Sequence, residues 1–166
     1  MNALYGGNVY CNLPTGYLDD SKFLIVPDSQ EVFSHDSLPQ NIIFELLEYA
    51  ESTDGLNPIL FHLKDVVGNV EHSVQNFQNI LPHQHSISFA DDVTYLHARI
   101  SGTNSLDVHM VLFRMPSFET DFLITLNDHL LLESNQDACF NAWTQYDFLQ
   151  LIQSIVIRDA SFLNGV

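Results

Sequence analysis

The run from Leu106 to Met115 constrains the fold most, because it is apolar on both sides of an extended chain. Side chains alternate between the two faces of a strand. One face would carry Leu106, Val108, Met110 and Leu112, and the other Val111, Phe113 and Met115. A strand that is apolar on both faces belongs in the middle of a covered sheet. The turn residues after Met115, followed by alternating Phe122, Ile124 and Leu126, predict its hairpin partner.

The other periodic segments predict further strands and two helices around this hairpin. Strands are predicted at residues 8–13, 22–26, 31–34, 93–101 and 156–158, and helices at 41–51 and from Thr144 onward. Residues 59–64 fit a strand or a helix, and 65–81 fit neither clearly. This order predicts an α+β fold, an α/β sandwich with a mostly antiparallel sheet between helices. With 166 residues and no internal repeat, we expect one domain over 1–166.

The segment from Asn41 to Glu51 has an apolar stripe at helical spacing, formed by Ile42, Ile43, Leu46, Leu47 and Ala50. On such a helix, the outward face would carry Asn41, Phe44, Glu45, Glu48 and Glu51. Carboxylates alone often form a solvated surface. An outward Phe44 among them would be covered by another segment or would anchor a partner.

The charge balance limits the partner class. Five Lys and Arg stand against 21 Asp and Glu, which gives a formal net charge of −16. So few basic residues cannot neutralise a phosphate backbone, which argues against nucleic acid and anionic membranes. We expect instead a basic protein surface, a cation or a cationic small molecule. The mutual repulsion of such acidic chains favours a monomer.

No motif predicts covalent chemistry or a cofactor, so we expect a non-catalytic protein. His83 and His85, with Asp91 and Asp92 nearby, are a weak candidate for a metal site. Cys11 falls in an alternating apolar run and is interpreted as a reduced core thiol. The start of the chain lacks the pattern of a signal peptide, and no apolar run is long enough for a membrane span. The expected compartment is the cytosol or nucleus.

Seven short motifs together resemble the Ran guanine nucleotide release factor (MOG-type) family. They are LYGG at 4–7, LPTGYLD at 13–19, VPDSQEVF at 26–33, IIFELLE at 42–48, FHLKD at 61–65, FRMP at 113–116 and TDFLITLN at 120–127. The PDSQEVF segment is the most specific of them. The resemblance continues in the C-terminal helix as far as Asp159, so that it spans nearly the whole chain.

The resemblance implies a PsbP-like fold, with about six antiparallel strands and helices on both faces. It also implies binding to the small GTPase Ran and release of its bound guanine nucleotide, in support of nuclear transport in nucleus and cytoplasm. The family's acidic carboxylate pair carries over onto Glu45 and Glu48, and Asp28 and Glu31 match acidic positions of the PDSQEVF segment. Asn41 and Phe44 complete the candidate Ran-binding residues, although Phe44 departs from the smaller aliphatic residue usual there.

Two other readings stay open. The chain could be an acidic interaction module without exchange activity, or a PsbP-like module that binds a small molecule or a metal. Whether a further Ran-binding protein joins the complex also stays open.

Overall fold

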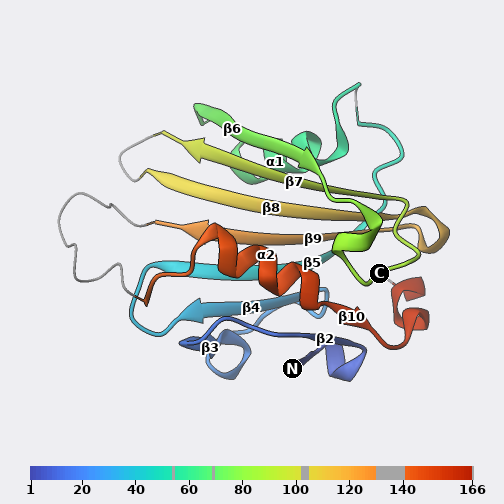
Figure 1. Cartoon of the computed structure of the whole chain (residues 1–166), viewed down its shortest axis with the longest axis horizontal. Helices are drawn as coiled ribbons and strands as arrows, with labels where there is room; N and C mark the ends of the chain where they lie inside the picture. Colours follow the sequence, from blue (N-terminus) through green and yellow to red (C-terminus); the bar gives the residue numbers. More distant parts are fainter. Residues whose placement is uncertain (54, 69, 102–104, 130–140, 166) are drawn as a thin grey trace.

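A seven-stranded antiparallel sheet forms the body of the computed structural model (Figure 1), which describes residues 1–53, 55–68, 70–101, 105–129 and 141–165. Its strand order is β3-β4-β5-β9-β8-β7-β6. The strands are β3 (Tyr17–Asp19), β4 (Gln30–His35), β5 (Gln40–Glu48), β6 (His72–Asn79), β7 (Asp92–Ile100), β8 (Leu106–Met115) and β9 (Thr120–Asp128). The predicted β8–β9 hairpin is confirmed, and β9 joins it to β5 in the centre of the sheet.

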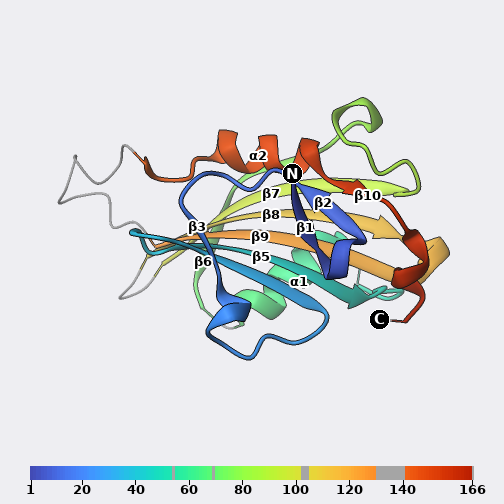
Figure 2. The same ribbon diagram turned by 90° about the horizontal axis from the view of Figure 1, so that it is seen from below.

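One helix packs on each face of the sheet, as predicted (Figure 2). Helix α1 (Pro58–Val67) buries Ile59, Leu63 and Val67 against β7, β8 and β9. Helix α2 (Gln145–Ser154) buries Phe148, Leu151 and Ile152 on the opposite face. Thr144 caps α2 in a reciprocal capping box with Asp147, in agreement with the predicted helix start. No helix among the described residues is long and apolar enough to cross a membrane.

A small second sheet shares the face covered by α2. It consists of β1 (Asn2–Leu4), β2 (Val9–Cys11) and β10 (Val156–Ile157), in the order β1-β2-β10. The strand predicted at 156–158 therefore joins this sheet through β2 and does not extend the main one. Cys11 is fully buried here, and burial raises the pKa of its thiol to about 12, which agrees with a core thiol.

The predicted helix at 41–51 is wrong, because this segment is strand β5. Ile42, Phe44 and Leu46 are buried in the cluster on the α2 side, while Leu47 packs against the cluster on the α1 side. A strand covered on both faces produces adjacent pairs of apolar residues, which also satisfy a helical stripe. Phe44 is fully buried between Phe33 and Phe122 and does not point outward.

Two weaker assignments also change. Residues 22–26 are not a strand: a short 3-10 helix, η2 (Asp20–Lys22), leads into a loop there. The ambiguous stretch 65–81 divides into the end of α1 and strand β6. Gly68 separates the two at a φ of 59°, a conformation that glycine adopts without steric cost.

Candidate functional site

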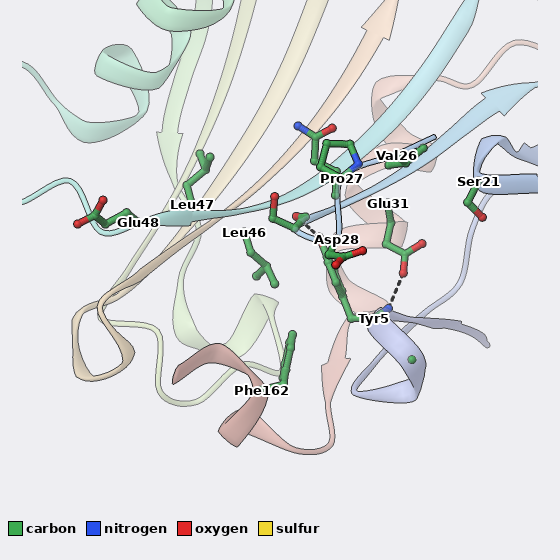
Figure 3. Close-up of a pocket in the computed structure, with 13 residues that line it drawn as sticks. Tyr5, Ser21, Val26, Pro27, Asp28, Glu31, Leu46, Leu47, Glu48 and Phe162 are labelled. Carbon is green, nitrogen blue, oxygen red and sulfur yellow. Dashed lines mark hydrogen bonds between the residues drawn. The ribbon is translucent and has the colours of Figure 1, made fainter. Parts of the chain in front are cut away.

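At one end of the main sheet, strand β5 extends beyond the first residue of its neighbour β4. Gln30 of β4 pairs with Glu45, but β5 continues to Glu48 with β9 as its partner on the other side. A depression of about 800 Å³ lies beside this free end of β5 (Figure 3). Its walls come from separate parts of the chain: the 3-10 helix η1 (Tyr5–Gly7), Ser21 of η2, the segment before β4 with the first two residues of β4, the end of β5, and Phe162 in the C-terminal 3-10 helix.

Three carboxylates line this depression: Asp28, Glu31 and Glu48. Glu31 is held in place, because its Oε1 accepts a hydrogen bond of 2.6 Å from the backbone N–H of Tyr5. Burial raises the pKa of the Tyr5 phenol, and the charges of Glu31 and Glu45 raise it further. Among the described residues, no side-chain hydrogen bond or ion pair engages Asp28 or Glu48. These two carboxylates are therefore available to a partner.

Glu48 also lines two neighbouring depressions. One, of about 510 Å³, lies between β5 and α1 and includes Glu45 and Asp65. The other, of about 550 Å³, includes Glu51 and Glu119. We call Asp28, Glu31, Glu45, Glu48, Glu51 and Glu119 the Glu48 surface.

Of the five basic side chains, only Lys64 lies near the Glu48 surface without an ion pair among the described residues: it is exposed on α1, next to Asp65, which lines one of the depressions. Arg99 and Arg114 form ion pairs with Asp107 and Asp121, at 2.8 and 3.0 Å. Arg158 stacks over the ring of Tyr10, with 4.1 Å from its guanidinium carbon to the ring centroid. Lys22 lies 3.7 Å from a carboxylate oxygen of Asp19. The carboxylates of the Glu48 surface outnumber the basic side chains near it, so the surface carries an excess of negative charge.

The structure brings four of the six sequence-predicted residues to this surface and separates the other two. Asp28, Glu31, Glu45 and Glu48 all line its depressions. Phe44 is buried beneath the surface, so it cannot touch a partner directly. Asn41 accepts a hydrogen bond from Asn127 near the other end of β5, about 23 Å along the strand from Glu48.

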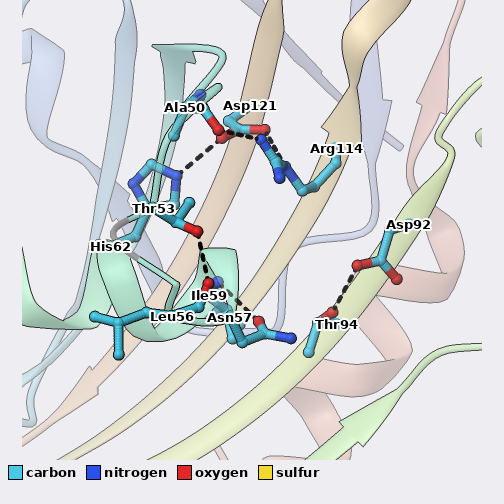
Figure 4. A network of polar contacts seen from close by, with 10 residues as sticks. All are labelled: Ala50, Thr53, Leu56, Asn57, Ile59, His62, Asp92, Thr94, Arg114 and Asp121. Carbon is cyan, nitrogen blue, oxygen red and sulfur yellow. Dashed lines mark hydrogen bonds and ion pairs between the residues drawn. The ribbon is translucent and has the colours of Figure 1, made fainter.

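A buried network that the sequence interpretation missed supports the surface from below (Figure 4). The fully buried carboxylate of Asp121 accepts hydrogen bonds from Arg114 Nε at 3.0 Å and from the Ala50 N–H at 3.2 Å, and it lies 3.0 Å from His62 Nε2. Arg114 also donates to the Ala50 carbonyl oxygen at 2.7 Å. Burial alone would raise the pKa of Asp121, but the hydrogen bonds from His62 and Arg114 outweigh it and hold this pKa below its ordinary value.

This network fixes the chain just after Glu48. It ties Ala50 to β8 and β9, and it ties α1 to β9 through His62. The stacking of Arg114 on the ring of Tyr49, at 3.9 Å, adds a further contact. Arg114 and Asp121 face each other across the β8–β9 hairpin, whereas His62 lies 59 residues before Asp121. In the sequence only the FHLKD, FRMP and TDFLITLN motifs mark these three residues.

The side chains of this region are mainly carboxylates and apolar groups. Within the described ranges, no group of three or more His, Cys, Asp and Glu side chains could hold a metal ion. His83 and His85 line a small depression with Ser86 and Gln153. The Glu48 surface offers carboxylates beside apolar side chains such as Leu46, Val26 and Phe162, a composition that suits a basic protein surface.

A protein-family model and several known proteins match this chain over most of its length. The model of the family described as Ran-interacting Mog1 protein matches residues 2–129. The chain belongs to the Mog1 family. The Ran guanine nucleotide release factor of Danio rerio is 30% identical, over 95% of this chain and 96% of the relative. The nuclear import protein MOG1 of Saccharomyces cerevisiae is 25% identical, over 95% and 82%.

Solved Mog1 structures share the fold. A mutant of protein Mog1 superposes with a TM-score of 0.77 at 18% identity, covering 98% of this chain and 97% of that one. The Saccharomyces cerevisiae Ran-binding protein Mog1p gives 0.76 at 19% identity, covering 96% and 95%. The expected α+β architecture is thereby confirmed as the Mog1 fold.

Proposed function

We propose that this chain binds the small GTPase Ran and promotes release of its bound guanine nucleotide, in support of nucleocytoplasmic transport. The observation that carries the proposal is the match of the Mog1 family model over residues 2–129. Relatives named as Ran guanine nucleotide release factors agree with it. The Glu48 surface supports it, because a region with an excess of negative charge is suited to a basic partner. On this proposal the chain works as one Ran-binding domain and as a monomer.

The carboxylates give the Glu48 surface a way to favour release. A small GTPase holds its nucleotide through backbone amides, a phosphate-loop lysine and Mg²⁺. A release factor must bind the nucleotide-free or loosened state more tightly than the loaded state. Free carboxylates such as Asp28 and Glu48 can attract a lysine that leaves the phosphates, and they repel the phosphates themselves. The Ran-binding residues in this proposal are Asp28, Glu31, Glu45 and Glu48.

The same proposal makes the chain a regulator and not a catalyst, working in the nucleus and cytoplasm. It assigns no role to nucleic acid, to a membrane or to a cofactor. The nuclear import role named for the yeast relative is consistent with that setting.

Release of a fluorescent guanine nucleotide from loaded Ran tests the proposal. The chain should speed release from Ran and leave an unrelated small GTPase unaffected. Binding to Ran without faster release would instead identify an acidic interaction module. No binding at all would refute the proposal.

A further inference from the structure

Three consecutive apolar side chains project into solvent beside the Glu48 surface. Phe23 is 76% exposed, Leu24 65% and Ile25 103%. Single exposed apolar residues are ordinary on a protein surface, whereas a contiguous group marks an interaction site. We call Phe23, Leu24 and Ile25 the apolar loop.

The apolar loop is held firmly at its first end. Asp19 caps η2 by accepting a hydrogen bond of 3.1 Å from the Ser21 N–H. The backbone N–H groups of Phe23 and Leu24 both donate to the Asp20 carbonyl oxygen at 2.9 Å. Ser34 of β4 donates to the Asp20 carboxylate at 2.7 Å, which ties η2 to the sheet.

The second end is held as well. The Gln30 N–H donates to the Pro27 carbonyl oxygen at 2.9 Å, which closes a turn before β4. The Leu46 N–H of β5 donates to the Ser29 carbonyl oxygen at 2.9 Å. Because both ends are fixed, the ordering that a partner must impose on the apolar loop is limited, and that lowers the cost of binding.

The apolar loop lies close in the chain to Asp28 of the Glu48 surface, so both can contact the same partner. Val26 and Pro27, the next residues, form a wall of the depression that contains Asp28 and Glu31 (Figure 3). Two residues lie between Ile25 and Asp28, so their Cα atoms are three steps and at most about 11 Å apart. A stable interface covers about 800 Å² on each partner, a patch about 30 Å across. A protein seated around Asp28 therefore comes within reach of Ile25.

We propose that the apolar loop docks on an apolar patch of Ran that lies beside the basic residues facing the Glu48 surface. This inference rests on the proposed function and assigns different kinetic roles to the carboxylates and to the apolar loop. The carboxylates attract the partner from a distance, which raises the association rate. The apolar loop loses its water only in the docked complex, which slows dissociation.

Surface plasmon resonance with the full chain and nucleotide-free Ran tests these two roles, because it measures the association and dissociation rate constants separately. In the double variant Leu24→Ser with Ile25→Ser, the dissociation rate constant should rise about tenfold or more. The association rate constant and its dependence on ionic strength should not change, because no charge is altered. The conservative exchange Leu24→Ile with Ile25→Leu should restore slow dissociation.

Tyr146→Ser is the matched control, because this side chain is 69% exposed on α2, away from the Glu48 surface. It should leave both rate constants unchanged. If the wild type binds normally and the double variant dissociates at the same rate, the apolar loop does not dock on Ran, and the proposed function remains intact. Absence of wild-type binding would refute both. Dimerisation of the free wild type that the double variant abolishes would assign the loop to a second copy of this chain and would also refute the inference.

Discussion

Glu45 and Glu48 leave opposite faces of the same strand. Glu45 pairs with Leu123, whose side chain belongs to the cluster beneath α1, whereas Glu48 ends β5 beside Asp28 and Phe162. Glu45 is also engaged, because it accepts a hydrogen bond from Gln30. The two carboxylates that the sequence paired on one helix face are therefore not equivalent, and a partner reaches Glu48 more readily.

Reversing the charge of Glu48 should weaken Ran binding more than reversing that of Glu45. Glu48→Lys should lower the association rate constant at low salt by about tenfold, because it reverses a charge at the centre of the acidic surface. Stopped-flow mixing at several salt concentrations measures the effect. Glu71→Lys is the control, since Glu71 is exposed and its carbonyl accepts from Ser101 beyond the far end of β7. Equal effects of Glu45→Lys and Glu48→Lys would contradict this ranking.

Phe44→Ala should destabilise the fold by about 3–5 kcal/mol, because it empties a site between Phe33 and Phe122. Chemical denaturation measures the loss. A variant of normal stability that fails to bind Ran would instead indicate a direct contact, contrary to the complete burial of Phe44.

Asp121→Asn should lower stability near neutral pH by about 3 kcal/mol, because Arg114 and His62 would lose their buried charged partner. That corresponds to a melting temperature about 10 °C lower. The folded pKa of Asp121 lies below its unfolded value, so its contribution is complete above the unfolded pKa and is lost as the pH falls through the folded pKa. The gap between wild type and variant should thus shrink in strong acid, and a gap that widens there would contradict this assignment.

His109 should make stability depend on pH between about 6.5 and 4. Burial, and then the charge of His97, lower the pKa of His109 to about 4, partly offset by Asp107. In this pH range the histidine is protonated in the unfolded chain but stays neutral in the folded chain. The free energy of unfolding therefore falls as the pH falls. The loss approaches about 3 kcal/mol by pH 4.

The variant His109→Asn checks this origin. The Tyr95 hydroxyl and His109 Nδ1 share a hydrogen bond of 2.8 Å, and an Asn side chain offers both an acceptor and a donor that can replace the imidazole nitrogen. Urea denaturation at pH 7 and pH 5 should show a smaller difference for this variant than for the wild type. An identical difference in the two proteins would exclude His109 as the source.

The sequence predicts the β8–β9 hairpin correctly but not strand β5 beside it or strand β6 at the edge of the sheet. The two apolar faces of β8 matched its place between β7 and β9. In β5, the adjacent apolar residues Ile42 and Ile43 favour a helix, because a strand covered on both faces does not alternate apolar and polar side chains. Strand β6 was missed for the opposite reason: all eight of its residues are exposed, so no apolar face marks it.

The candidate site was predictable only in part. The carboxylates of residues 28, 31, 45 and 48 came from family resemblance. Their assembly with Tyr5 and Phe162 depends on tertiary contacts that no local pattern encodes. The sequence predicts a strand at the exposed Phe23 and Leu24, because apolar character alone does not distinguish a buried strand from an exposed loop.

Nucleotide release from Ran by the double variant Asp28→Lys with Glu48→Lys tests the central claim most directly. Its control is Asp36→Lys with Glu71→Lys, which makes the same charge change at two exposed sites away from the Glu48 surface. The account predicts that the first variant, folded normally by circular dichroism, loses nearly all stimulation of release, while the control retains most of it. Full stimulation by the first variant, or equal loss in both, would contradict the assignment of the Glu48 surface to Ran.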